Sequence, residues 1–166
     1  MADTNGIGED GERYAAIRLS QNRIFEVIQL GGKVPAYDLI CKINDANKPY
    51  QFLVQVKAIE TPPIFTKTKP VRIKTPVPKD KYEALQKLSL PTYVAGVNIN
   101  TGDVYISAAN NPHNQYGGSI PTTYHLSSSN LIRSRCYLTM LKHDVITYWD
   151  GLDVNAYKPT FNSIIK

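Results

Sequence analysis

Residues 50–59 read Tyr50-Gln-Phe-Leu-Val-Gln-Val-Lys-Ala-Ile59, and this stretch decides the fold. Its alternation of apolar and polar residues predicts a long β-strand, because successive side chains of a strand point to opposite faces of a sheet. The buried face would carry Phe52, Val54 and Val56, and the other face would carry Gln55 and Lys57. The strand is therefore expected to hold two polar side chains side by side.

The segments around this strand supply its expected neighbours. Residues rich in turn formers, Asn44-Asp-Ala-Asn47, predict a hairpin that joins it to the strand before it. Apolar and β-branched runs predict further strands at 24–30, 38–43, 92–99 and 104–107, and amphipathic spacing predicts helices at 9–22, 79–88 and 131–149. This order predicts an α/β fold in which a mixed central β-sheet is flanked by helices.

The chain has the size of one domain. It has 166 residues, 42% of them apolar, which suffices for one continuous core. We expect residues 1–8 to be a disordered N-terminus, 9–150 to form a single α/β domain, and 151–166 to form a C-terminal tail. No run is long and apolar enough to cross a bilayer, so we expect a cytoplasmic protein without a membrane partner.

The cysteines and histidines predict no metal site. Cys41 and Cys136 lie far apart in apolar surroundings, which indicates buried free thiols in a reducing compartment. The three histidines do not fall at the spacing of metal ligands, so we expect surface or structural roles for them.

Positive charge is concentrated in one segment. From Thr66 to Lys87 there are seven basic and two acidic residues, and this excess of five positive charges equals the net charge of +5 for the whole chain. Five prolines between 62 and 78 predict a loop or an edge ribbon here. The basic side chains expected to neutralise nucleic-acid phosphates are Lys67, Lys69, Arg72, Lys74, Lys79 and Lys81. Lysine and proline also protect edge strands from pairing, which is the alternative interpretation of this segment.

A hairpin of the second and third strands would bring candidate catalytic residues together. The start of one strand lies opposite the end of the other, so Asp38 would neighbour Gln55 and Lys57. Hydrolysis of a phosphodiester requires stabilisation of phosphoryl charge and activation of a water, and a divalent cation held by carboxylates does both. Glu12 on the first helix is a further acid, although Glu9 could take its place.

Gly11-Glu12-Arg13 on a helix, Asp38, and Gln55-Val56-Lys57 on a strand resemble the restriction-endonuclease-like, or PD-(D/E)XK, nuclease superfamily, in particular its small Holliday-junction-resolvase and Mrr-type members. The resemblance covers roughly Glu9 to Ile106. It implies a restriction-endonuclease-like core and a Mg²⁺- or Mn²⁺-dependent endonuclease acting on nucleic acid, with DNA as the expected substrate. It also implies that Glu12, Asp38 and Gln55 hold the metal and that Lys57 is the catalytic lysine.

One departure from the family leaves other functions open. Most members carry a carboxylate where this chain has Gln55, and a neutral oxygen holds a divalent cation less strongly. The alternatives are a catalytically inactive nucleic-acid-binding module and a protein-interaction component of a defence or toxin system, in which the basic ribbon meets an acidic partner. The resemblance is compatible with a homodimer or with an accessory protein partner.

Overall fold

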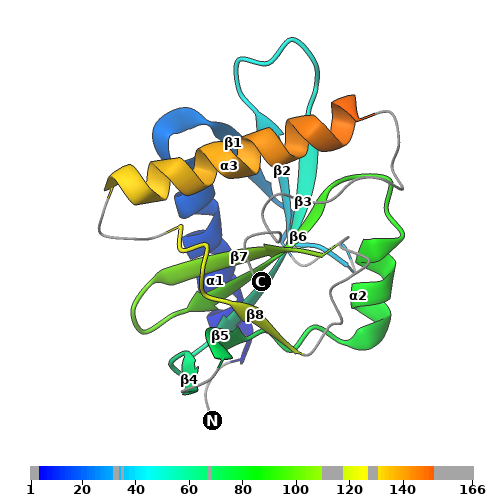
Figure 1. Cartoon of the computed structure of the whole chain (residues 1–166). Helices are drawn as coiled ribbons and strands as arrows, with labels where there is room; N and C mark the ends of the chain where they lie inside the picture. The colour runs from blue at the N-terminus through cyan, green and yellow to red at the C-terminus, as the bar shows by residue number, and fades with distance from the viewer. Residues whose placement is uncertain are drawn as a thin grey trace.

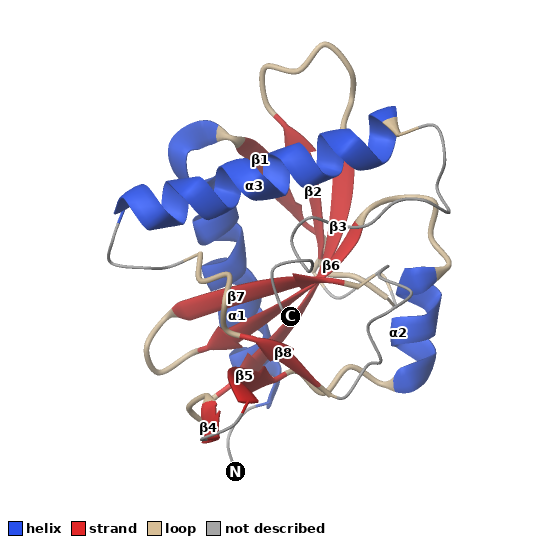
Figure 2. Ribbon diagram, in the orientation of Figure 1, coloured by secondary structure: helices blue, strands red, loops and turns tan. Residues whose placement is uncertain are grey.

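A five-stranded mixed sheet forms the centre of the computed structural model, which describes residues 4–31, 34, 36–66, 69–109, 118–126 and 131–151 (Figure 1). The strands follow the order β1-β2-β3-β6-β7. Their bounds are Phe25–Gln29 for β1, Leu39–Ile43 for β2, Gln51–Ile59 for β3, Thr92–Asn98 for β6 and Asp103–Ala108 for β7. β3 pairs with β6 in parallel, and the other neighbours are antiparallel. The strands fan out, as the natural twist of a sheet requires (Figure 2).

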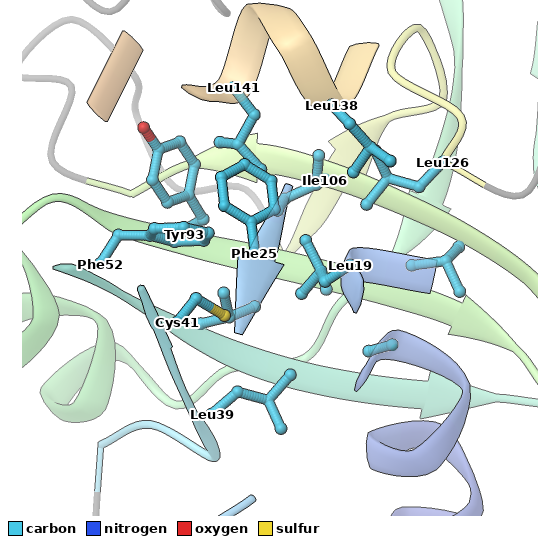
Figure 3. Close-up of a cluster of buried hydrophobic side chains, with 14 of the residues drawn as sticks. Leu19, Phe25, Leu39, Cys41, Phe52, Tyr93, Ile106, Leu126, Leu138 and Leu141 are labelled. Atoms are coloured by element: carbon cyan, nitrogen blue, oxygen red, sulfur yellow. The ribbon is translucent and has the colours of Figure 1, made fainter. Parts of the chain in front are cut away.

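Two long helices cover one face of this sheet. They are α1 (Thr4–Ser20), which a short 3-10 turn at Gln21–Arg23 follows, and α3 (Leu131–Asp150). Leu138, Leu141 and Val145 form the fully buried stripe of α3, at the spacing that places them on one side of a helix. Phe25, Phe52 and Tyr93 lie beneath this helix (Figure 3), and successive ring centroids are 5.0 and 5.5 Å apart in edge-to-face geometry.

The other face is covered by α2 and by a small second sheet. Helix α2 spans Lys79–Gln86, and the second sheet consists of β4 (Ile64–Thr66), β5 (Lys69–Lys74) and β8 (Ser119–Pro121). Tyr82 and Leu85 of α2 and Ile73 of β5 pack with Val94 of β6 in a second apolar cluster. Gly96 makes this contact close, because a Cβ there would lie 2.8 Å from Ile73 Cγ2.

The expected α/β class is confirmed: a mixed sheet lies between helices. The predicted strands and helices all form, with bounds shifted by a few residues. The basic segment contains an antiparallel ribbon, β4 and β5, in agreement with one of the two expectations for it.

Three expectations differ from the structure. Helix α1 begins at Thr4 instead of about Glu9, so residues 4–8 belong to the helix. Strand β8 lies between residues 107 and 131, where no strand was predicted, and pairs with β5. Cys41 is buried as predicted, but Cys136 is exposed on α3 because the buried stripe of the helix faces away from it. Residues 127–130, the expected cap of α3, lie outside the described residues, as does most of the expected tail.

No helix in the described part of the chain combines the length and the apolar character needed to span a membrane.

Candidate active site

The candidate site lies at the N-terminal end of β2, where the antiparallel strand β3 continues beyond its last pair with β2. The last residue pair of the two strands is Leu39 with Val54, so the remainder of β3 has a free edge on this side. Asp38 occupies the beginning of that edge. Its backbone N–H donates to the Val54 carbonyl oxygen at 2.9 Å, and its Oδ2 accepts a hydrogen bond from the Val56 N–H at 2.7 Å. The carboxylate thus satisfies a backbone donor that β2 no longer reaches.

Helix α1 closes the other side of the site. Gly11 faces Ala58 so closely that a Cβ on Gly11 would overlap the Ala58 Cβ, and it would lie 3.4 Å from the Ala58 Cα. Only glycine permits this approach of the helix to β3. The next residue, Glu12, is thereby held beside the strand that carries Gln55 and Lys57.

A cleft of about 520 Å³ opens between α1 and the free edge of β3. All four residues predicted to be catalytic, Glu12, Asp38, Gln55 and Lys57, line it. The rest of its described lining consists of Ile7, Gly8, Val56, Ala58, Ile59, Glu60 and Thr61. The structure therefore brings together the side chains that the strand pattern predicted to be neighbours.

Burial raises the pKa of both carboxyl groups of the motif. Burial raises the pKa of Glu12, and the nearby charge of Asp38 raises it further, whereas Lys57 acts in the opposite direction. Burial also raises the pKa of Asp38, against the lowering effects of the Val56 N–H and of Lys57. Both acids therefore hold their protons more tightly than exposed carboxyls do.

Gln55 is turned so that it donates to Asp38. Its amide nitrogen lies between two acceptors, Asp38 Oδ2 and the Val56 carbonyl oxygen, the latter at 3.1 Å. The side chain is 3% exposed, so water does not compete for this arrangement. In this orientation Gln55 positions Asp38, and it would need to rotate its amide to turn Oε1 toward a shared cation.

The donor set of the cleft is compatible with one hard cation. Among the described lining residues there are three carboxylates, Glu12, Asp38 and Glu60, against one lysine, Lys57, which leaves an excess of negative charge. The Oδ1 atom of Asp38 has no hydrogen-bond partner within the described chain. The described residues contain no cluster of three or more His, Cys, Asp or Glu side chains suited to a metal ion, so a ligand set here would combine carboxylates with neutral oxygens, among which the Gln55 amide is available after rotation.

The basic residues expected to bind phosphates are not equally available. Arg72 uses its guanidinium to hold β8, with donors 2.8 Å from Ser119 Oγ and 2.6 Å from the Ser119 carbonyl oxygen. Lys79 lies 3.8 Å from Glu83, while Lys74 is exposed.

Lys81 is the member of this set that acts on the site, because its charge lowers the pKa of Asp38 against the stronger effect of burial. Lys67 lies outside the described residues, and of Lys69 only the backbone, at the beginning of β5, is described.

Two cleft residues were not singled out from the sequence. Glu60 directly follows β3, and its carbonyl oxygen accepts a hydrogen bond from Asn100 Nδ2 at 2.8 Å, which fixes the end of the strand. The sequence signal for Glu60 as a cleft residue was its position three residues after Lys57. Ile7 was missed because the helix begins earlier than its amphipathic pattern indicates.

Comparisons of the chain with protein-family models, with curated proteins and with solved structures found no significant match.

Proposed function

We propose that this chain is a divalent-metal-dependent phosphodiesterase of the restriction-endonuclease-like class, an endonuclease acting on nucleic acid, with DNA as the substrate to test first. The observation that carries the proposal is the meeting of Glu12, Asp38, Gln55 and Lys57 in one cleft. These residues come from α1, the start of β2, and β3, in the order in which the family resemblance requires them. The proposal includes a restriction-endonuclease-like core for the central sheet and its helices.

The proposed cofactor is Mg²⁺ or Mn²⁺. Asp38, Glu12 and, after rotation of its amide, Gln55 would hold the ion. When bound, such an ion withdraws charge from a phosphoryl oxygen and lowers the pKa of a water. Its charge would also offset the excess of carboxylates, which would otherwise repel a phosphate from the cleft.

The side chains have separate tasks in this proposal. Lys57 places its ammonium group near the scissile phosphate and stabilises the negative charge that builds on its oxygens. Glu12 would help to hold the ion and would orient the attacking water, which releases its proton to solvent. The water oxygen bonds to phosphorus as the bond from phosphorus to the leaving sugar oxygen breaks, and solvent protonates that oxygen. Before the ion binds, Gln55 holds Asp38 in place through the hydrogen bond from its amide.

The test is cleavage of plasmid, branched and single-stranded DNA by the purified chain with Mg²⁺ or Mn²⁺. We expect cleavage that chelation stops and that Asp38→Ala and Lys57→Ala each reduce by about a hundredfold or more. Lys42→Ala is the matched control, since Lys42 is an exposed lysine on β2 and does not line the cleft. Equal background cleavage by wild type and all three variants would refute the enzyme.

The hydrogen bond from Gln55 to Asp38 favours a second candidate, a nucleic-acid-binding module that has lost its metal. In this candidate the Gln55 amide permanently occupies Asp38 Oδ2 and compensates its charge. Calorimetric titration with MgCl₂ or MnCl₂ separates the two candidates. Binding that Asp38→Ala abolishes supports the nuclease, whereas salt-dependent DNA binding without metal binding supports the module.

A further inference from the structure

We infer that the cleft accepts a single, unpaired nucleic-acid strand, with a base lying against an apolar wall beside the scissile phosphate. This inference deepens the proposed function and rests on it. The wall is Ile7 of α1, which lines the same cleft as Asp38 and Lys57. Ala58 and Ile59 of β3 also line the cleft, from opposite faces of the strand. All three are half-buried, so part of each side chain remains accessible from the cleft.

Apolar side chains beside a phosphate-processing site distinguish unpaired from paired strands. A duplex presents phosphates and sugars on its outside and hides the faces of its bases by stacking. An unpaired nucleotide can turn its base face onto an apolar or aromatic side chain, and proteins that bind single strands use such contacts. A cleft of about 520 Å³ has the size of a small-molecule pocket, which suits about one nucleotide and is far smaller than a duplex segment.

The distribution of charge gives the strand a path past this wall. Inside the cleft the single cation among the described lining residues is Lys57, which suits one phosphate. Lys81 lies outside the lining, on α2, yet near enough for its charge to act on Asp38. It therefore suits the phosphate of the neighbouring nucleotide. One cation inside the cleft and a second one near it match the repeat of phosphates along one strand.

The experiment measures the binding of a labelled single-stranded DNA, its duplex, and a single-stranded RNA of the same sequence, and their cleavage in Mg²⁺. The variants are Ile7→Ala, and Ile7→Phe as a second probe that keeps an apolar side chain of larger area. Ile17→Ala is the matched control, because Ile17 lies on the same helix, is 58% exposed and does not line the cleft. Fluorescence anisotropy without divalent cation gives the affinity independently of cleavage.

We expect the single strands to be bound and cleaved in preference to the duplex. Ile7→Ala should weaken single-strand binding by about fivefold to tenfold, Ile7→Phe should preserve or strengthen it, and Ile17→Ala should leave it unchanged. Asp38-dependent cleavage of duplex at an equal rate, with Ile7→Ala behaving as Ile17→Ala does, would overturn the inference and leave the nuclease standing. Absence of Asp38-dependent cleavage of every substrate would refute the proposed nuclease, and the inference with it. The comparison of DNA with RNA identifies the strand.

Discussion

Replacing Gly11 with alanine should push helix α1 away from strand β3. The new Cβ would overlap the Ala58 Cβ and would lie 3.4 Å from its Cα and 3.7 Å from its backbone nitrogen. Displacing the backbone of β3 would disturb its hydrogen bonds to the neighbouring strands, so helix α1 itself must shift. Overpacking of this kind costs about 1–3 kcal/mol, and alanine returns about 1 kcal/mol through its higher helix propensity. The net destabilisation should therefore be about 0–2 kcal/mol.

Gly8 provides a matched control on the same helix. A Cβ at this position would meet no atom within 4 Å, so Gly8→Ala gains helix propensity without a clash. It should raise the free energy of unfolding by about 0.5–1 kcal/mol. The difference between the two variants isolates the contact with Ala58 and should be about 1–3 kcal/mol in favour of Gly8→Ala.

Thermal unfolding followed by circular dichroism measures this difference. For a chain of this length, 1 kcal/mol corresponds to about 2–4 °C in Tm. Gly8→Ala should unfold at a higher temperature than wild type, and Gly11→Ala should unfold several degrees below Gly8→Ala. If the two substitutions raise the Tm equally, α1 does not approach β3 as closely as described, and the placement of Glu12 in the cleft loses its physical basis.

Three further predictions follow from the site and the core. Because burial raises the pKa values of Glu12 and Asp38 above their ordinary 4.5 and 3.8, these two carboxyls bind protons more tightly in the folded chain than in the unfolded chain. Without divalent cation, urea unfolding should therefore show stability falling as the pH rises through these values, and Asp38→Asn should weaken that fall; an unchanged profile would contradict the assignment. Gln55→Glu adds a carboxylate beside Asp38, so it should lower Tm without metal and enlarge the Tm increase that MgCl₂ produces; an equal increase in wild type would argue against a shared cation. In the folded chain a thiol reagent should modify Cys136 but not Cys41, and two rapidly reacting thiols would contradict the burial of Cys41.

The sequence predicted the central sheet because its strands carry strong local signals. In β3 the alternation that places Val54 and Val56 in the core also fixes the register with β2, since a slip by one residue would expose the apolar face. The register in turn set Asp38 opposite Gln55. A local pattern therefore sufficed to predict a contact between residues 17 positions apart in the chain.

Features that depend on distant partners were not predicted. Strand β8 has three residues, too few for a periodic pattern, and its partner in β5 lies far away, as the pair Arg72 and Pro121 shows. The orientation of α3 was predicted only in part, because its apolar residues extend beyond one face. Ile132 is apolar but 83% exposed, whereas Leu138 on the same helix is fully buried. Which apolar residues a helix buries is decided by the surface on which it packs.

The neutral side chain at position 55 has a physical explanation that depends on the charge of the cleft. Three carboxylates already face one lysine, and a fourth beside Asp38 would raise both pKa values and weaken the fold whenever the cation is absent. The Gln55 amide instead donates to Asp38 and stabilises its ionised form, so the cleft persists in the metal-free state. The same hydrogen bond must break before Gln55 can offer its oxygen to a cation. Under the proposed function, rotation of this amide on metal binding would separate a nuclease from a metal-free binding module, and the Gln55→Glu comparison tests whether an oxygen at position 55 contributes to holding a cation.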